Sequence, residues 1–190
     1  MNSETSKRTK NAPIALFVYN RPSHTRQTVE ALQRCDLAEE SDLIIYSDAP
    51  KSVEQTEAVN EVRQYIHQID GFKTVYIVRR ETNLGLAQSI IDGVSSLCEK
   101  YGRVIVLEDD LVTSPYFLQF MNDALEIYKD ENQVMHISGG TYPIGSMKEE
   151  TFFLRAPFCW GWATWDRAWR HFRKNNDVMS KFNRRMRRDF

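Results

Sequence analysis

Three consecutive acids, Glu108-Asp109-Asp110, follow the apolar run Val104 to Leu107 directly and are the strongest chemical feature of the sequence. Neighbouring carboxylates repel one another, and the repulsion grows where a buried strand holds them partly away from water. A divalent cation would relieve it, and hard oxygen ligands suit Mg²⁺ or Mn²⁺ held by one or two carboxylates together with phosphate oxygens. The alternative is a solvated turn whose acids do no chemistry.

Polar residues also follow the earlier apolar runs of the chain. They are Tyr19, Asn20, Arg21, Asp48, Arg79, Arg80 and Asn83. A tyrosine ring can stack on a base, an aspartate can accept a hydrogen bond from a base N–H such as the imide of uracil, and arginines can meet phosphates. Taken singly, each also has a plain explanation as a packing residue, a turn residue or a solvated charge. Asn83-Leu84-Gly85 opens a helix, where backbone N–H groups favour a phosphate or a sugar hydroxyl.

All four tryptophans of the chain fall in one short segment, at Trp160, Trp162, Trp165 and Trp169. Aromatic faces stack on the apolar faces of sugar rings, and indole N–H groups donate to hydroxyls. The same rings would also serve as a hydrophobic plug over the sheet edge. Both uses are compatible, and the segment is expected to turn into a helix.

Strands and helices alternate along the chain. The strands are predicted at 13–19, 43–47, 74–78, 104–107 and 134–138, with a sixth at 151–154; the helices are predicted at 25–34, at 53–69, after the turn at 83–85, and after Ser114-Pro115 as N-cap and first helical residue. In the third helix, Leu86, Ile90, Val94 and Leu97 are expected to face inward. Short continuous apolar strands indicate an α/β fold with a mostly parallel sheet flanked by helices. Ligands of such sheets bind beyond the carboxyl ends of the strands, where the polar residues above gather.

Bulk properties exclude several classes of protein. The 190 residues carry 25 Lys and Arg against 26 Asp and Glu, so no global field draws in nucleic acid or anionic membrane. The three cysteines contain no CxxC pair, which argues against a zinc ribbon and for reduced thiols. No apolar run approaches the roughly 20 residues of a membrane helix. We therefore expect a cytoplasmic protein, with peripheral membrane contact left open.

The ends of the chain differ from its middle in composition. Residues 1–11 are polar and predicted to be a disordered leader. Residues 174–190 form a basic tail with four arginines in five residues, which could contact anionic lipid or phosphate. A frayed or truncated terminus is the simpler interpretation of that tail.

Five stretches together resemble the GT-A fold glycosyltransferases, namely the bacterial family 2-like sugar transferases and, more distantly, the N-acetylglucosaminyltransferase I group. They are 13–22, 47–50, 83–86, 106–111 and 159–165, and the resemblance covers about 12–173 as one nucleotide-sugar-binding domain. It implies a Rossmann-like GT-A domain that passes a sugar from a nucleotide-sugar donor, expected to be UDP-linked, to a hydroxyl of a carbohydrate or other acceptor, with inversion.

The resemblance also implies roles for residues. Asp110 would hold the Mn²⁺ or Mg²⁺ that bridges the donor diphosphate, and Asp109 would touch the donor ribose or sugar. Asp48 would read the base, while Tyr19 and Asn20 would line the nucleotide pocket. The remaining predicted donor-binding residues are Arg21, Asn83, Glu108, Trp160 and Trp162.

An inverting enzyme needs a general base near the acceptor, and here the sequence departs from the family pattern. The stretch 154–158, where the resembling families supply a carboxylate, contains no acid. Asp166 is the nearest later candidate for the catalytic base, with Glu149 and Glu150 upstream. An acid at that position is also expected simply because it begins a helix.

Two other functions stay open at this point. One is a nucleotide-sugar-binding module without catalysis, left by truncation. The other is a phospho-acceptor signalling domain, which also gathers acids and Mg²⁺ at strand ends. That domain usually needs acids after the first strand and a lysine after the fifth, whereas this chain has Asn20-Arg21 and Gly139-Gly140 there.

Overall fold

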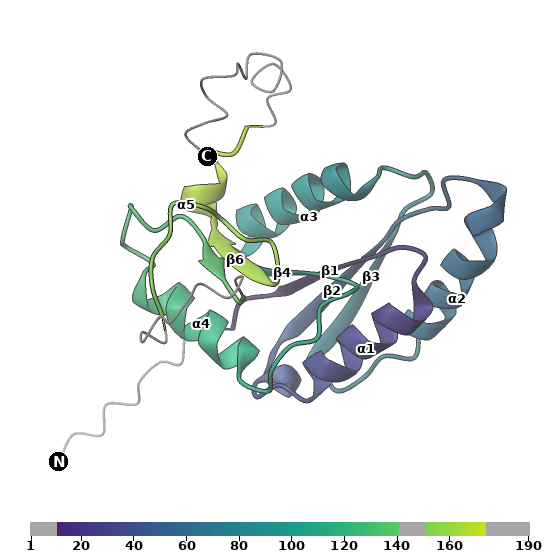
Figure 1. The fold of residues 1–190 in the computed structure, drawn as a ribbon, viewed down its shortest axis with the longest axis horizontal. Helices are drawn as coiled ribbons and strands as arrows, with labels where there is room; N and C mark the ends of the chain where they lie inside the picture. Colours follow the sequence, from purple (N-terminus) through teal and green to yellow (C-terminus); the bar gives the residue numbers. More distant parts are fainter. Residues whose placement is uncertain (1–10, 141–150, 174–190) are drawn as a thin grey trace.

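The structure, a computed structural model, describes residues 11–140 and 151–173 (Figure 1). The predicted leader apart from Asn11, the basic tail, Glu149 and Glu150 lie outside the described residues. No helix in the described ranges is both long enough and apolar enough to cross a membrane.

The described residues form one six-stranded sheet in the order β3-β2-β1-β4-β6-β5. The strands are β1 (Ile14–Val18), β2 (Asp42–Ser47), β3 (Thr74–Arg79), β4 (Arg103–Glu108), β5 (Ile137–Ser138) and β6 (Trp162–Trp165). The four strands from β3 to β4 are parallel, and β6 runs antiparallel to both β4 and β5. The predicted α/β class with a mostly parallel sheet is confirmed.

Helices cover both faces of this sheet (Figure 1). They are α1 (Pro22–Gln33), α2 (Thr56–Ile66), α3 (Leu86–Tyr101), α4 (Phe117–Ile127) and the short α5 (Asp166–Trp169), with 3₁₀ turns at Ala38–Glu40 and Val53–Gln55. Helices α1, α2 and α4 pack on one face, and α3 packs on the other. Each face therefore has its own buried core.

Alternation along β1 divides its side chains between these two cores. Ile14 and Leu16 point to the α1 side, whereas Ala15 and Phe17 point to the α3 side. All five residues of β1 are buried, because the strand lies in the middle of the sheet with a layer of helix on each face. This explains why the strand appears in the sequence as a continuous apolar run.

Several predicted boundaries were wrong. Helix α1 begins at Pro22, where proline lacks only an N–H that the first turn leaves free. Helix α4 begins at Phe117, so Ser114 and Pro115 are not its N-cap and first residue. Leu86 does not face inward but is exposed, since it sits in the first turn of α3 on the rim of a cavity.

The predicted sixth strand was also misplaced. Residues 151–154 are not a strand, and the sixth strand is instead Trp162–Trp165, inside the tryptophan-rich segment. All four residues of β6 are buried, because the strand is hydrogen-bonded between β4 and β5. The sequence of this segment shows its aromatic residues but not that it forms an interior strand.

The strand order contains one switch point. The chain runs outward from β1 through β2 to β3, and then returns to place β4 on the other side of β1. In open α/β sheets, ligands bind in the crevice where the strand order reverses. A signalling domain of the flavodoxin-like type would have the order 2-1-3-4-5, so this topology argues against that alternative.

Candidate functional site

A cavity of about 340 Å³ opens at the carboxyl ends of β1, β2 and β4, at the switch point. The structure brings seven of the predicted site residues to its wall. They are Tyr19, Asn20, Arg21, Asp48, Asn83, Glu108 and Asp109. Because these residues come from four separate segments, their convergence is a result of the topology and not of their proximity in sequence.

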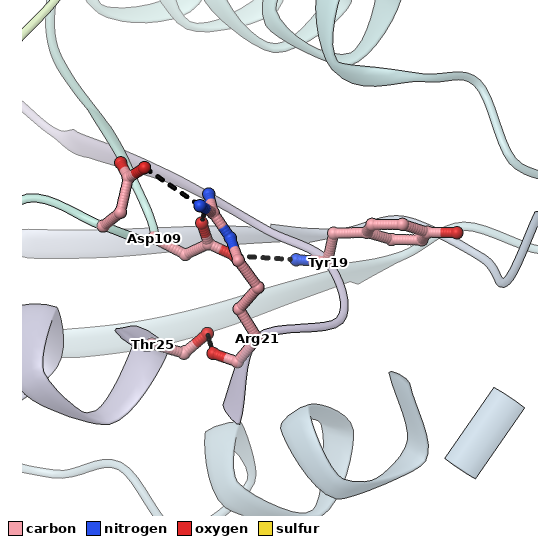
Figure 2. Close-up of polar contacts among 5 residues, drawn as sticks. Tyr19, Arg21, Thr25 and Asp109 are labelled. Atoms are coloured by element: carbon pink, nitrogen blue, oxygen red, sulfur yellow. Dashed lines mark hydrogen bonds and ion pairs between the residues drawn. The ribbon is translucent and has the colours of Figure 1, made fainter. Parts of the chain in front are cut away.

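Arg21 is the positive partner of the acidic run (Figure 2). Its Nη1 lies 3.0 Å from Oδ2 of Asp110, and its Nη2 donates to Oδ1 of Asp109. The second oxygen of Asp109 accepts the backbone N–H of Tyr19 at 3.3 Å. The repulsion expected between the acids is thus relieved in part from within the chain, by an arginine that was predicted to meet phosphate.

The backbone of Arg21 is held in place while its side chain remains half exposed. Its carbonyl accepts both the backbone N–H and the Oγ1 hydroxyl of Thr25, each at 2.9 Å. Thr25 is completely buried in the first turn of α1. Figure 2 shows this anchor on one side of Arg21 and the contact with Asp109 on the other.

Burial and charge oppose each other at the acids. Burial raises the pKa of Asp109 more than the charge and hydrogen bond of Arg21 lower it. Burial also raises the pKa of Glu108, and the charges of Asp110 and Asp109 raise it further. For Arg21, burial lowers the pKa, but the charges and hydrogen bonds of Asp109 and Asp110 together outweigh burial and raise it, so the arginine stays charged. One guanidinium therefore leaves the run short of positive charge.

Asp48 organises the opposite wall of the cavity. Its Oδ1 accepts the N–H groups of Ala49 at 2.9 Å and Leu84 at 3.0 Å, and its Oδ2 accepts the N–H of Gly85 at 2.9 Å. Asn83 adds a 2.7 Å bond from its side-chain amide to the carbonyl of Ala49. The carboxylate thus ties the end of β2 to the start of α3, where a negative charge suits the helix dipole.

Tyr19 has a fixed ring position. Its hydroxyl donates to the side-chain carbonyl of Gln55 and accepts the backbone N–H of Lys51 at 2.8 Å. In Figure 2 the ring points away from the acids. A half-buried ring held at its far end offers a flat surface beside the cavity.

The floor of the cavity is aromatic. Phe17 and Tyr46 stack with their ring centroids 4.9 Å apart. Gly93 of α3 lets the helix approach them, since a Cβ there would lie 2.8 Å from the tip of Phe17. Ser89, one turn earlier on the cavity wall, is buried, and its hydroxyl has no hydrogen-bond partner among the described residues.

Apart from Asp166, three predicted site residues do not line this cavity. Trp160 is exposed in the segment before β6, and Trp162 is buried, where it stacks on His136 at 5.1 Å and belongs to the α3-side core. Trp162 is accordingly a packing residue. Asp110 is exposed and paired with Arg21, which does line the cavity.

The predicted catalytic base, Asp166, lies beside the amino-terminal end of β4, whereas the cavity lies at the carboxyl end of that strand. Its N–H donates to the carbonyl of Gly102, just before β4, and its carboxylate pairs with Arg170. Since β4 spans about 20 Å at 3.3 Å per residue, Asp166 is separated from Glu108 by roughly that distance. The antiparallel direction of β6, which the sequence did not indicate, carries Asp166 away from the cavity.

Asp110 fits a divalent ion as a single protein ligand. No group of three or more His, Cys, Asp or Glu residues in the described ranges is arranged to hold a metal. Both oxygens of Asp109 are engaged, but Asp110 uses only Oδ2 toward Arg21 and its side chain is 42% exposed. Mg²⁺ and Mn²⁺ sites often use one or two carboxylates and take their other ligands from phosphates and water.

The prediction from sequence missed several residues of the site. Lys51 and Ser89 line the cavity. Gln55 and Arg63 form hydrogen bonds to two residues of its wall, Tyr19 and Asp48 respectively. Arg63 is buried on α2 and donates to the carbonyls of Asp48 at 3.2 Å and Arg80 at 2.8 Å. Its only sequence signal was a charged residue beside Val62 on the apolar face of a helix.

Comparisons with known proteins gave structural likenesses only. No protein-family model and no curated protein matches the chain. Among solved structures it is similar to the mannosyltransferase PcManGT from Pyrobaculum calidifontis in complex with GDP-Man and Mn²⁺, with 12% identity over 68% of this chain and 36% of that chain, and a TM-score of 0.47. It is similar to S. aureus TarS, with 15% identity, 66% and 21% coverage and a TM-score of 0.41.

A second TarS structure, of residues 1–349, gives 15% identity, 72% and 40% coverage and a TM-score of 0.43. The chain thus spans well under two thirds of the length of each of these proteins. At such identities the likeness concerns the fold alone and assigns no role to any residue of this chain.

Proposed function

We propose that the cavity binds a nucleotide-sugar donor and that the protein is a glycosyltransferase of the GT-A type. The observation that carries this proposal is the meeting of Arg21 with Asp109 and Asp110 at the switch point, beside a cavity with an aromatic floor. Such a site offers a flat apolar surface for rings and a charged mouth for a diphosphate. The two ends match the two chemical halves of a nucleotide sugar.

Within this proposal the base and ribose lie between Tyr19 and Asp48, and the diphosphate lies at the mouth near Arg21. The ring of Tyr19 provides a stacking face. Oδ1 of Asp48 accepts two backbone N–H groups, but Oδ2 accepts only one and retains a lone pair, so the carboxylate can still accept an imide N–H of uracil through Oδ2. We propose a UDP-linked donor on that ground.

Asp110 would hold Mn²⁺ or Mg²⁺, which when bound would supply charge stabilisation to the departing diphosphate. Arg21 adds a guanidinium beside the same group, and arginine suits phosphate oxygens through paired N–H groups. Glu108 and Asp109 would orient hydroxyls of the donor, since both line the cavity. The acceptor is a carbohydrate or other hydroxyl compound, and the transfer proceeds with inversion.

A donor-binding module without catalysis is a second candidate, and one observation favours it. An inverting transfer needs a base beside the acceptor. Among the described residues, the cavity carries the carboxylates of Asp48, Glu108 and Asp109 only, and Asp166 lies at the far edge of the sheet. Turnover would then need a carboxylate from outside the described ranges to act as the base.

Thermal-shift measurements with UDP- and GDP-sugars, each with and without Mn²⁺, test donor binding. We expect UDP-sugars with Mn²⁺ to raise the melting temperature, and Asp110→Asn to lose the metal-dependent part. Asp123→Asn, an exposed acid on α4 with a comparable side-chain bond, is the matched control. Donor hydrolysis by the wild type separates the transferase from the binding module, and no shift with any nucleotide sugar contradicts both.

A further inference from the structure

The acidic run already has a cation of its own. The guanidinium of Arg21 contacts both Asp109 and Asp110, and its Nη1 lies 3.0 Å from Oδ2 of Asp110. A metal ion that used Asp110 would have to share that carboxylate with Arg21. Two cations on one carboxylate repel each other, so each weakens the binding of the other.

Charge counting gives the direction of the exchange. Glu108, Asp109 and Asp110 bring three negative charges, and Arg21 returns one positive charge. A divalent ion in place of Arg21 compensates the run better than the arginine does. The displaced guanidinium then needs an anion, and a diphosphate arriving at the mouth of the cavity provides one.

The structure allows the side chain of Arg21 to move while its backbone stays. Thr25 fixes the carbonyl of Arg21, and the side chain is 43% exposed. Among the described residues, only the contacts with Asp109 and Asp110 hold the guanidinium. A rotation within the side chain is therefore sufficient to turn it from the acids toward the mouth.

We infer that Arg21 is a displaceable counter-cation, which occupies the acidic run in the absence of ligand and passes to the donor diphosphate when a divalent ion takes Asp110. Because the diphosphate belongs to the donor, this exchange rests on the proposed function. It makes Arg21 a competitor of the metal in the free protein and a partner of the metal in the complex. Metal and nucleotide then bind with positive coupling.

The test is a Mn²⁺ titration without nucleotide, followed by the electron paramagnetic resonance signal of the free ion. We expect Arg21→Gln to bind Mn²⁺ about tenfold more tightly than the wild type, as removal of a cation beside a partly buried carboxylate predicts. The same variant is expected to bind UDP about tenfold more weakly in the presence of saturating Mn²⁺, because the diphosphate loses its arginine. Arg79→Gln is the matched control, since Arg79 lies outside the cavity and only 4.0 Å from exposed Glu81.

Unchanged or weaker Mn²⁺ binding by folded Arg21→Gln overturns the exchange. Circular dichroism establishes whether the variant folds, since Asp109 loses its partner. If it does not fold, Arg21→Lys decides the matter: a single ammonium cannot span both carboxylates, so Mn²⁺ binding should tighten by a smaller factor. Equal or weaker Mn²⁺ binding by that variant also overturns the exchange.

Failure of the exchange and failure of the proposed function give different results. If Mn²⁺ binding tightens in Arg21→Gln but no nucleotide sugar binds to the wild type, the competition at the acids stands and the donor site is wrong. If UDP-sugars bind to the wild type with Mn²⁺ but Arg21→Gln leaves Mn²⁺ binding unchanged, the donor site stands and Arg21 is a fixed part of it.

Discussion

Asp48→Asn separates two roles for one residue, the support of a loop and the direct recognition of a base. The buried carboxylate accepts three backbone N–H groups, from Ala49, Leu84 and Gly85. Asparagine keeps one oxygen and replaces the other by an NH₂ group, which faces N–H donors. At least one N–H therefore loses its acceptor whichever way the amide is turned.

The expected cost follows from the bonds lost. A hydrogen bond to a charged group contributes about 1.5–3 kcal/mol, and a buried donor left without a partner costs about 1–3 kcal/mol. We expect Asp48→Asn to lower the free energy of unfolding by about 2–4 kcal/mol. For a chain of this size, that corresponds to a melting temperature lower by about 4–16 °C.

Urea denaturation followed by circular dichroism measures this change, with Asp123→Asn as a control expected within about 0.5 kcal/mol of the wild type. Nucleotide affinity is measured on the same samples at a temperature where both variants are folded. Unchanged stability with a selective loss of UDP binding would refute the structural role. In that event the Asp48 carboxylate would contact the nucleotide base directly, and the backbone at Ala49, Leu84 and Gly85 would not depend on it for stability.

Three further predictions concern the cavity and the thiols. Gly93→Ala should lower the urea-derived unfolding free energy by about 1 kcal/mol, because contact with the rings below costs about 1–3 kcal/mol and helix propensity returns about 1 kcal/mol; increased stability would contradict this. Burial raises the pKa of Glu108 in the folded state. The contribution of Glu108 to the free energy of unfolding is therefore favourable below its pKa in the unfolded chain, and it is lost as the pH rises through its pKa in the folded protein. Glu108→Gln should thus stabilise the protein at pH 7 and lose that advantage near pH 4 in parallel urea titrations. Cys159 is exposed, whereas burial raises the pKa of Cys98 to about 12, so peptide mapping after iodoacetamide treatment at pH 7.5 should find Cys159 modified and Cys98 protected.

The parallel part of the fold could be predicted because each strand there carries its own signal. Continuous apolar runs ending in polar residues mark β1, β2 and β4, and the alternation with helices indicates their direction. The same logic located the cavity, since parallel strands bring their carboxyl ends to one edge. Seven of the predicted residues line it for that reason.

The antiparallel part could not be predicted, because its order depends on long-range pairing. Trp162–Trp165 inserts between β4 and β5, although β5 precedes it in the chain. The residue types of Trp162–Trp165 do not determine which strand this segment pairs with or in which direction. As a result, Trp162 is a core residue, and Asp166 lies beside the amino-terminal end of β4, opposite the cavity.

The pairing of Arg21 with the acidic run is the other feature that the sequence left undecided. The two lie 88 residues apart, and only the return of the chain past β1 places them together. Repulsion among three acids requires a positive charge but does not specify its source. The structure supplies a guanidinium that satisfies one charge of three, with Asp109 still raised in pKa by burial. An acidic run that remains underneutralised and next to an aromatic cavity is unfavourable for folding, and the divalent ion that we propose to bind with the donor would compensate its charge.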